Sequence, residues 1–151
     1  TIFYARGVLE TVKKLRWCPD VIHCHSWMTA LAPLYIKKAY RDEPSFRSSK
    51  VVFSLYEDKF DQPFHADYAN KLMLKGIAKK DIAVLKEPID FTTVCKLAVE
   101  HSDGIVQQSP NANKEVLDYA RSLGKPILEY QDTDDFADRC NRFYDLVAET
   151  E

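Results

Sequence analysis

The sequence predicts a single α/β domain of Rossmann-like type with three layers, in which helices cover both faces of a parallel sheet. Short apolar runs alternate along the chain with longer segments whose apolar residues recur at helical spacing. Such runs are typical of strands buried on both faces, and the long connections demand right-handed crossovers between parallel neighbours. With 151 residues, 46% of them hydrophobic, the chain is large enough for one domain over residues 1–151 without disulfides or metals.

The first part of the chain supplies two strands and two helices. Residues 2–17 repeat their apolar side chains at helical spacing and end in basic residues, which favours an amphipathic helix. Residues 21–25 are short and mostly apolar, as in a buried parallel strand. Helical spacing returns over residues 27–41, with Ser26 as the expected N-cap. Residues 50–56 are β-branched and apolar, so we expect a second core strand there.

The middle of the chain begins with its least regular stretch. Residues 57–88 contain prolines and only weak helical patterns, so we expect short helices and loops. A clear helical pattern follows over residues 91–101. An Asp-Gly turn then leads into a short strand over residues 105–107, and the next helix is expected over residues 110–123, beginning at its proline.

The last part of the chain completes the alternation. Gly124 is a stop signal for the preceding helix, and residues 126–130 form the last expected strand. Residues 134–149 predict a final amphipathic helix whose inward face carries Phe136, Cys140, Phe143 and Leu146 or Val147. Because the sequence opens inside a helical pattern without an initiator Met, we expect it to be incomplete at its N-terminus, whereas the closing helix indicates a natural C-terminus.

The composition argues against several classes of function. The formal net charge of -2 leaves no basic field for nucleic acid or for an anionic membrane surface, so neither is an expected partner. No apolar run approaches the ~20 residues of a spanning helix and nothing resembles a signal peptide, which predicts a cytoplasmic protein. The cysteines lack the spacing of a disulfide framework and are expected to stay reduced; they are Cys18, Cys24, Cys95 and Cys140.

The residues that follow the strands are the candidates for chemistry, because ligands on parallel sheets bind beyond the carboxyl ends of the strands. Four corners are therefore expected to share one edge: residues 25–27, 56–58, 107–109 and 130–132. The second corner carries an acidic pair that could bind a cation or act as a general base, or could simply be solvated.

The histidines and the cysteine of the first strand, and the glycines, each have both a chemical and a structural interpretation. Alternation along the first strand places His23 and His25 on one face and Cys24 on the other, so the three cannot converge on zinc and no metal site is expected. His23 is interpreted as a buried imidazole that holds a backbone group, and His25 as either functional or a satisfied polar residue. Cys24 is interpreted as an inert core thiol. The glycines are isolated, so neither a dinucleotide fingerprint nor a P-loop is present and no cofactor is expected.

Three segments carry a resemblance to a known family. Residues 19–35, PDVIHCHSWMTALAPLY, resemble the PDVVHAHDWHTGLAPAYL segment of bacterial glycogen and starch synthases. Residues 50–56, KVVFSLY, are similar to the family's K-x-V-F-T-V-H-N strand, and residues 103–110, DGIVQQSP, are similar to its D-x-I-x-x-V-S-P strand. The resemblance extends over residues 19–115 and includes short members of Bacteroidetes type that consist of this domain.

The resemblance implies the N-terminal half of a GT-B glycosyltransferase, which moves glucosyl from ADP-glucose to α-1,4-glucan with retention of configuration. It implies substrate-binding residues at His25, Ser26, Trp27, Tyr56, Glu57 and Ser109. The family's lysine-glycine-glycine loop and the arginine, lysine and glutamate of its C-terminal domain lie outside this sequence, so no catalytic residue is assigned within it. Two matched positions also differ from the family, because Ser26 replaces an aspartate and Tyr56 replaces a histidine, followed by Glu57 instead of asparagine.

Three functions are compatible with these observations. The first is a glycogen or starch synthase domain that binds α-glucan or maltooligosaccharide, with no turnover of the nucleotide sugar expected from this chain alone. The second is a degenerate, non-catalytic glucan-binding or regulatory scaffold module. The third is an independent small enzyme that uses His25, Glu57 and Ser109 at the sheet edge. The sequence also leaves open a homo-oligomer and a C-terminal domain supplied in trans.

Overall fold

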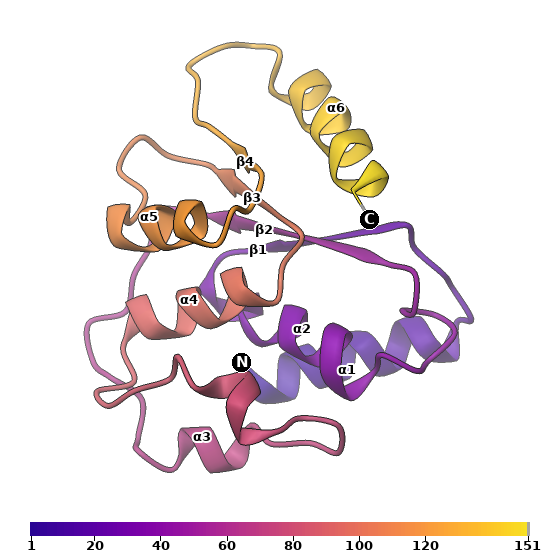
Figure 1. Ribbon diagram of the computed structural model, residues 1–151, viewed down its shortest axis with the longest axis vertical. Helices are drawn as coiled ribbons and strands as arrows, with labels where there is room; N and C mark the ends of the chain where they lie inside the picture. The colour runs from indigo at the N-terminus through magenta and orange to yellow at the C-terminus, as the bar shows by residue number, and fades with distance from the viewer. Residues whose placement is uncertain (151) are drawn as a thin grey trace.

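The computed structural model describes residues 1–150, and its centre is a parallel sheet of four strands in the order β1-β2-β3-β4 (Figure 1). The strands are β1 (Val21–His25), β2 (Lys50–Leu55), β3 (Gly104–Gln107) and β4 (Ile127–Leu128). The helices are α1 (Ile2–Lys14), α2 (Leu31–Leu34), α3 (Tyr68–Lys71), α4 (Phe91–Glu100), α5 (Lys114–Ser122) and α6 (Phe136–Glu149). Each strand pairs in parallel with the next along the chain, so the predicted α/β class is confirmed.

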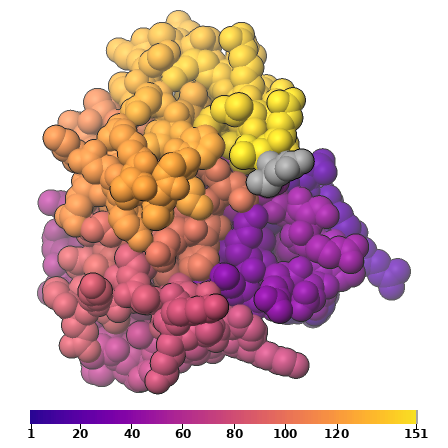
Figure 2. Space-filling model, in the orientation of Figure 1, coloured from indigo at the N-terminus to yellow at the C-terminus, as the bar shows by residue number. Residues whose placement is uncertain are grey.

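Helices cover the two faces of the sheet unequally (Figure 1). The helices α1, α2, α4 and α5 lie on one side, whereas α6 lies on the other and packs against β2 and β4. Phe53 and Ile105 face the four-helix side, and Val52 and Val106 face α6. The inner strands are thus apolar on both faces, which is why they read as continuous apolar runs in the sequence. In the space-filling view α6 crosses the upper part of the molecule and the segment around α3 forms its base (Figure 2).

The close packing of α6 on the sheet depends on Gly104, the first residue of β3. A Cβ atom at this position would lie 2.7 Å from a methyl group of Val147 and 2.9 Å from the ring of Phe143. Both side chains belong to α6 and are buried. Glycine is therefore required where the helix approaches the backbone of the strand.

The helix expected over residues 27–41 is broken into three parts. A 3-10 turn spans Trp27–Thr29, α2 follows, and Tyr35–Ala39 forms a π-helical turn. Pro33 has no N–H to donate to the preceding turn, so the α-helical ladder begins afresh at Leu31. Ser26 does not cap this segment as expected, because its φ of 67° turns the hydroxyl away and toward Asp58.

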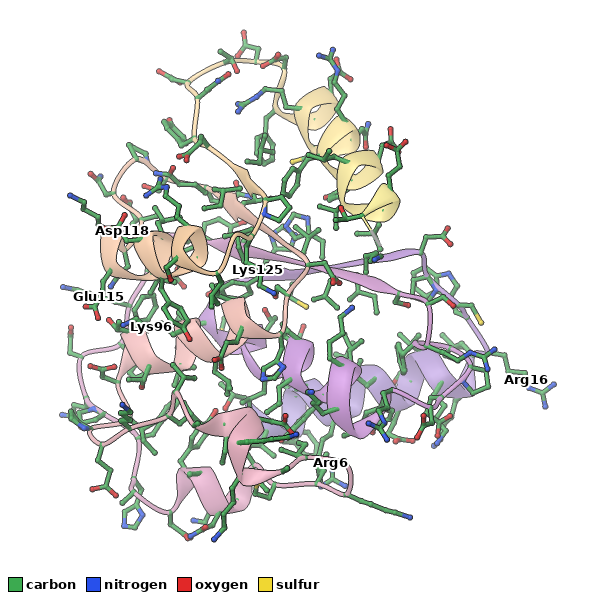
Figure 3. All side chains as sticks on the ribbon, in the orientation of Figure 1. Arg6, Arg16, Lys96, Glu115, Asp118 and Lys125 are labelled. Atoms are coloured by element: carbon green, nitrogen blue, oxygen red, sulfur yellow. The ribbon has the colours of Figure 1, made fainter. Side chains whose placement is uncertain are left out.

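Other boundaries also differ from the expectations. The first helix ends at Lys14 rather than at residue 17, and Arg16 has a φ of 52° and projects from the body of the molecule (Figure 3). The helix expected to begin at Pro110 begins at Lys114, because the Asn113 side chain caps it by accepting a hydrogen bond from the Val116 N–H at 3.1 Å. The last strand has two residues instead of five.

The position of the final helix was predicted correctly, but one of the residues expected on its inward face is exposed. Cys140, Phe143 and Val147 are buried against the sheet. Phe136 is 39% exposed, so its inward placement was wrong; of the two alternatives for the last inward position, Val147 is buried and Leu146 is 55% exposed. In the irregular segment over residues 57–88, the short α3 and a 3-10 turn at Lys79–Ile82 confirm the expected mixture of short helices and loops. Within residues 1–150, no helix has the length and apolar character needed to cross a membrane.

Polar side chains tie the helices of the larger layer to one another. The Lys96 ammonium group of α4 lies 2.6 Å from the Glu115 carboxylate of α5 (Figure 3). Lys125, after α5, donates to the Glu100 carbonyl at 3.1 Å and to the Ser102 carbonyl at 2.7 Å. Burial lowers the pKa of Lys125, and these carbonyl oxygens satisfy its donors. These contacts join α4 to α5 and to the segment between α5 and β4.

Candidate functional site

The corners that follow the strands meet at one edge of the sheet, as expected. Residues after β1 contact residues after β2, and residues after β2 contact residues after β3, through hydrogen bonds between side chains. The fourth corner joins through the backbone, because the Tyr130 N–H donates to the Gln107 side-chain oxygen at 3.3 Å. A parallel sheet brings these ends together because all its strands point the same way.

Two stacked imidazoles lie on the α6 side of this edge. The rings of His23 and His25 are 4.0 Å apart and nearly parallel, whereas Cys24 points to the other side and is buried. His25 Nδ1 lies 2.9 Å from the Tyr56 hydroxyl. Burial lowers the pKa of His25 and raises that of Tyr56, which favours the neutral form of both groups. Burial also raises the pKa of the Cys24 thiol to about 12, so this cysteine is an inert core residue.

His23 connects the sheet to α6 through side chains. Its Nδ1 atom lies 2.5 Å from the Tyr144 hydroxyl, and its Nε2 atom lies 2.5 Å from the Ser54 hydroxyl, which also accepts from Gln108 at 3.0 Å. The expectation of a backbone partner was therefore wrong, although the structural role was right. Burial lowers the pKa of His23 to about 4, and the neighbouring His25 adds to the shift.

Ser26 and Trp27 both contact the loop after β2. The Ser26 hydroxyl donates to the Asp58 carboxylate, which follows β2. The Trp27 ring packs edge-to-face on Phe60 with centroids 4.8 Å apart, and Phe60 stacks on Phe64 at 4.6 Å. Trp27 thus packs against the loop after β2, and it does not line the pocket beside that loop.

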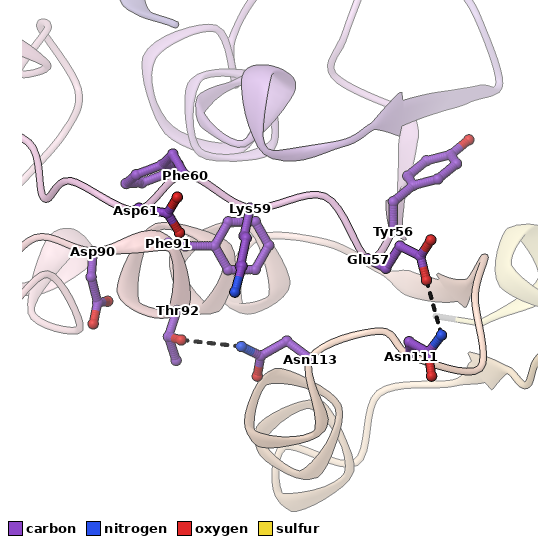
Figure 4. Close-up of a pocket in the computed structure, with 10 residues that line it drawn as sticks. All are labelled: Tyr56, Glu57, Lys59, Phe60, Asp61, Asp90, Phe91, Thr92, Asn111 and Asn113. Atoms are coloured by element: carbon purple, nitrogen blue, oxygen red, sulfur yellow. Dashed lines mark hydrogen bonds between the residues drawn. The ribbon is translucent and has the colours of Figure 1, made fainter.

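A pocket of about 320 Å³ opens beside the loop after β2 (Figure 4). Its lining comes from the loop after β2, the start of α4 with the residue before it, and the segment before α5. The lining residues are Tyr56, Glu57, Lys59, Phe60, Asp61, Asp90, Phe91, Thr92, Asn111 and Asn113. The pocket therefore combines three aromatic rings with carboxylate, amide, hydroxyl and ammonium groups, which is the usual lining of a site for a polar small molecule.

Glu57 is the carboxylate whose orientation is best defined in this pocket. One of its oxygens accepts from the Ser109 hydroxyl at 2.9 Å and from the Asn111 amide at 3.1 Å. These two hydrogen bonds lower the pKa of Glu57 and keep it ionised. On the opposite side, the Asn113 amide donates to the Thr92 hydroxyl at 3.2 Å, joining α5 to α4 (Figure 4).

Of the six residues named from the resemblance, only Tyr56 and Glu57 line the pocket. Ser109 reaches it indirectly by holding Glu57, and His25 does so by contacting Tyr56. Sequence reasoning missed the asparagines at positions 111 and 113. Their signal was present in the Pro-Asn-x-Asn run that precedes α5, since Asn is a favoured helix cap.

His25 and Ser109 do not form a nucleophile–base pair. The Ser109 hydroxyl donates to the Glu57 carboxylate, and the His25 imidazole is paired with Tyr56. A serine nucleophile requires an adjacent base that takes its proton and is usually an imidazole. Within residues 1–150, no group of three or more His, Cys, Asp or Glu side chains is arranged to hold a metal ion.

A family model described as the starch synthase catalytic domain matches residues 1–143. The chain belongs to the starch synthase catalytic domain family. The resemblance found in three segments of the sequence is therefore confirmed, and the fold agrees with the N-terminal domain of a GT-B glycosyltransferase.

Curated relatives of this starch synthase family chain are named glycogen synthase. The protein of Pelodictyon phaeoclathratiforme is 47% identical over 133 residues, covering 86% of this chain and 26% of the relative. That of Clostridium perfringens is 40% identical over 117 residues, covering 76% of this chain and 23% of the relative. That of Chlorobium phaeovibrioides is 33% identical over 117 residues, covering 76% and 22%. The chain thus spans about a quarter of the length of these relatives. No solved structure matches it.

Proposed function

We propose that this domain binds the α-glucan acceptor of a glucosyl transfer from ADP-glucose, and that it does so in the pocket beside Glu57. The observation that carries the proposal is the lining of the pocket, at the ligand-binding edge of the sheet in a starch synthase family domain. Aromatic rings offer apolar contact to the C–H faces of a sugar, and the surrounding polar groups match its hydroxyls.

The polar groups of the pocket differ in what they can offer a sugar. The ionised Glu57 accepts hydrogen bonds only, whereas Tyr56 and the Thr92 hydroxyl both donate and accept. Asn111 orients Glu57, so the carboxylate needs no reorganisation when a hydroxyl arrives. A hydrogen bond to a charged partner is stronger than a neutral one, so the preoriented Glu57 carboxylate is the contact most worth testing.

We further propose that the 151-residue chain alone binds glucan without transferring glucosyl units. Transfer requires donor-binding groups that the family resemblance assigns to segments outside these residues, and none of the polar groups in the pocket forms a nucleophile–base pair. Binding and turnover are then separable, and the acceptor side can be measured by itself.

A second candidate function is a non-catalytic scaffold in which sugar binding has been lost. The hydrogen bonds within the site favour it, since His25 is paired with Tyr56, Ser26 with Asp58, and Ser109 with Glu57. A sugar would have to compete with these internal partners. The two candidates are distinguished by whether maltooligosaccharide binds at all.

The test of the pocket is a pair of substitutions measured by isothermal titration with maltohexaose. Glu57→Gln removes the charge but keeps the shape, and we expect it to weaken binding about tenfold, since one charge-assisted hydrogen bond becomes neutral. Asp132→Asn, an exposed carboxylate after β4 outside the pocket, is the matched control and should leave the affinity unchanged. Equal affinity of the Glu57→Gln variant and the unaltered chain would place the sugar elsewhere.

A further inference from the structure

A second pocket, of about 230 Å³, lies at the same edge of the sheet beside the start of α6. Its lining comes from the end of β3, the segment after β4 and α6, and it includes Gln107, Gln108, Glu129, Tyr130, Phe136 and Arg139. The two aromatic residues are only partly buried, with Tyr130 38% and Phe136 39% exposed. Open aromatic rings beside polar groups offer contact to the apolar faces of a sugar.

The charges around the second pocket balance one another. The Glu129 carboxylate lies 3.0 Å from the Arg121 guanidinium, and the Arg139 guanidinium donates to the Glu129 carbonyl at 2.7 Å. The exposed Asp132 also lines the pocket, but no hydrogen bond within residues 1–150 orients its carboxylate, so Asp132→Asn leaves a sugar site intact. No strong field of either sign selects an ion, and the lining favours an uncharged ligand with many hydroxyl groups.

The amide groups of the two neighbouring glutamines differ in what they leave free. Both ends of the Gln107 amide are engaged, because its nitrogen donates to the Ser109 carbonyl at 3.0 Å and its oxygen accepts from the Tyr130 N–H at 3.3 Å. The Gln108 nitrogen donates to the buried Ser54 hydroxyl at 3.0 Å. The Gln108 carbonyl oxygen has no donor within residues 1–150, so it can accept a hydrogen bond from a ligand in the second pocket.

A relay of four side chains, Tyr144, His23, Ser54 and Gln108, connects α6 to this amide. Ser54 is fully buried, and within residues 1–150 its hydroxyl has two partners, the Gln108 nitrogen and His23 Nε2. Because the hydroxyl accepts from Gln108, its own proton points to His23 Nε2. The neutral His23 then carries its proton on Nδ1 and donates it to the Tyr144 hydroxyl at 2.5 Å. The relay thus keeps the Gln108 nitrogen on Ser54 and leaves its carbonyl oxygen to the pocket.

The second pocket and the pocket beside Glu57 lie on either side of Ser109. The Ser109 hydroxyl donates to Glu57 at 2.9 Å, and the Asn111 amide does so at 3.1 Å. These groups form the end of the first pocket that lies opposite Asp90 (Figure 4). Gln108 precedes Ser109 directly and lines the second pocket. A linear glucan chain that leaves the first pocket at this end therefore reaches the second pocket across Ser109.

We propose that the second pocket holds a further glucosyl unit of the same α-glucan chain, and that a sugar hydroxyl donates to the Gln108 carbonyl oxygen that the relay holds in place. The inference rests on the proposed function, because it extends the glucan from the pocket beside Glu57. Two linked contacts bind a polymer more tightly than one, since the second forms with a ligand that is already bound. Affinity therefore depends on the length of the glucan.

The experiment compares maltose with maltohexaose in titrations of the 151-residue chain followed by NMR. We expect maltohexaose to bind at least tenfold more tightly. Gln108→Met keeps the length of the side chain and removes its carbonyl oxygen, so the affinity for maltohexaose should fall about tenfold while that for maltose stays the same. Gln62→Met is the matched control, because Gln62 is exposed and lines neither pocket, and it should change neither affinity.

The outcomes separate this inference from the proposed function. Unchanged maltohexaose affinity in the Gln108→Met variant, or an equal loss for both sugars, would overturn the inference. If Glu57→Gln still weakened the binding of both sugars, the proposed function would stand without the second pocket. Absence of binding by either sugar would overturn both.

The direction of the relay is tested by NMR of the His23 ring nitrogens near neutral pH, where burial keeps this histidine neutral by lowering its pKa. We expect the proton on Nδ1 in the unaltered chain. Tyr144→Phe removes the hydroxyl that accepts this proton, so the proton should move to Nε2, the Gln108 amide should turn over, and maltohexaose, but not maltose, should bind more weakly. A proton on Nε2 in the unaltered chain would overturn the proposal, because Gln108 would then present its nitrogen to the pocket. Circular dichroism of the variants confirms that they remain folded.

Discussion

Replacing Gly104 tests the packing of α6 on the sheet. In the Gly104→Ala variant, the new methyl group lies 2.7 Å from Val147 and 2.9 Å from the Phe143 ring, both closer than van der Waals contact allows. Neither neighbour can move freely, because both are buried between α6 and the sheet. Overpacking of this kind costs ~1 to 3 kcal/mol, and for a chain of this size that lowers the melting temperature by about 2 to 12 °C.

The assay is thermal unfolding followed by circular dichroism, with Gly7→Ala as the matched control. A Cβ atom at Gly7 meets nothing within 4 Å, and alanine is the better helix former by ~0.5 to 1 kcal/mol, so this variant should be more stable than the unaltered chain. If Gly104→Ala melted at the same temperature as the unaltered chain, the close approach of α6 to β3 would be refuted.

Three further predictions concern residues in or next to the site. Ser26→Asp with Tyr56→His restores the side chains found in the family. Combined with Asp58→Asn, which removes the carboxylate that Ser26 contacts, these substitutions should strengthen maltohexaose binding in titration. An unchanged affinity of the triple variant would contradict a surviving sugar site. Between about pH 6.5 and 4, the unfolded chain protonates His23 but the folded chain does not, because folding lowers the pKa of His23 to about 4. The melting temperature should therefore fall less steeply over this pH range in the His23→Asn variant than in the unaltered chain. Identical pH slopes for the two proteins would contradict this prediction. Asn113→Ala should lower stability by ~1 kcal/mol and weaken binding, whereas Asn113→Asp should keep the helix cap, so equal unfolding free energies for the two would be inconsistent with capping.

The fold was largely predictable because its signals are periodic. The strand around Val52 and Phe53 is apolar on both faces, and the helix around Val94 and Leu97 repeats at helical spacing, so local pattern and tertiary burial agree. The boundaries were less predictable. Nothing in the sequence around Ser26 indicates that its φ is positive, and this backbone turn sends its hydroxyl to Asp58 instead of to the next helix.

The site was only partly predictable because the residues that line the pocket come from segments far apart in the sequence. The position of Tyr56 and Glu57 after a strand was enough to place them at the ligand-binding edge. Phe91, Thr92 and Asn113 reach the same pocket from α4 and from the segment before α5, and their convergence depends on how these helices pack. A sequence pattern carries the spacing within one element but not the distance between two elements.

The central claim, that this starch synthase family chain is a glucan-binding acceptor domain, is tested most directly by titration of the purified chain with maltohexaose and, separately, with ADP-glucose near neutral pH. The account predicts saturable binding of maltohexaose, lost or weakened in Glu57→Gln, and no turnover of ADP-glucose. Absence of maltohexaose binding by the folded chain would contradict the account and would favour the scaffold function.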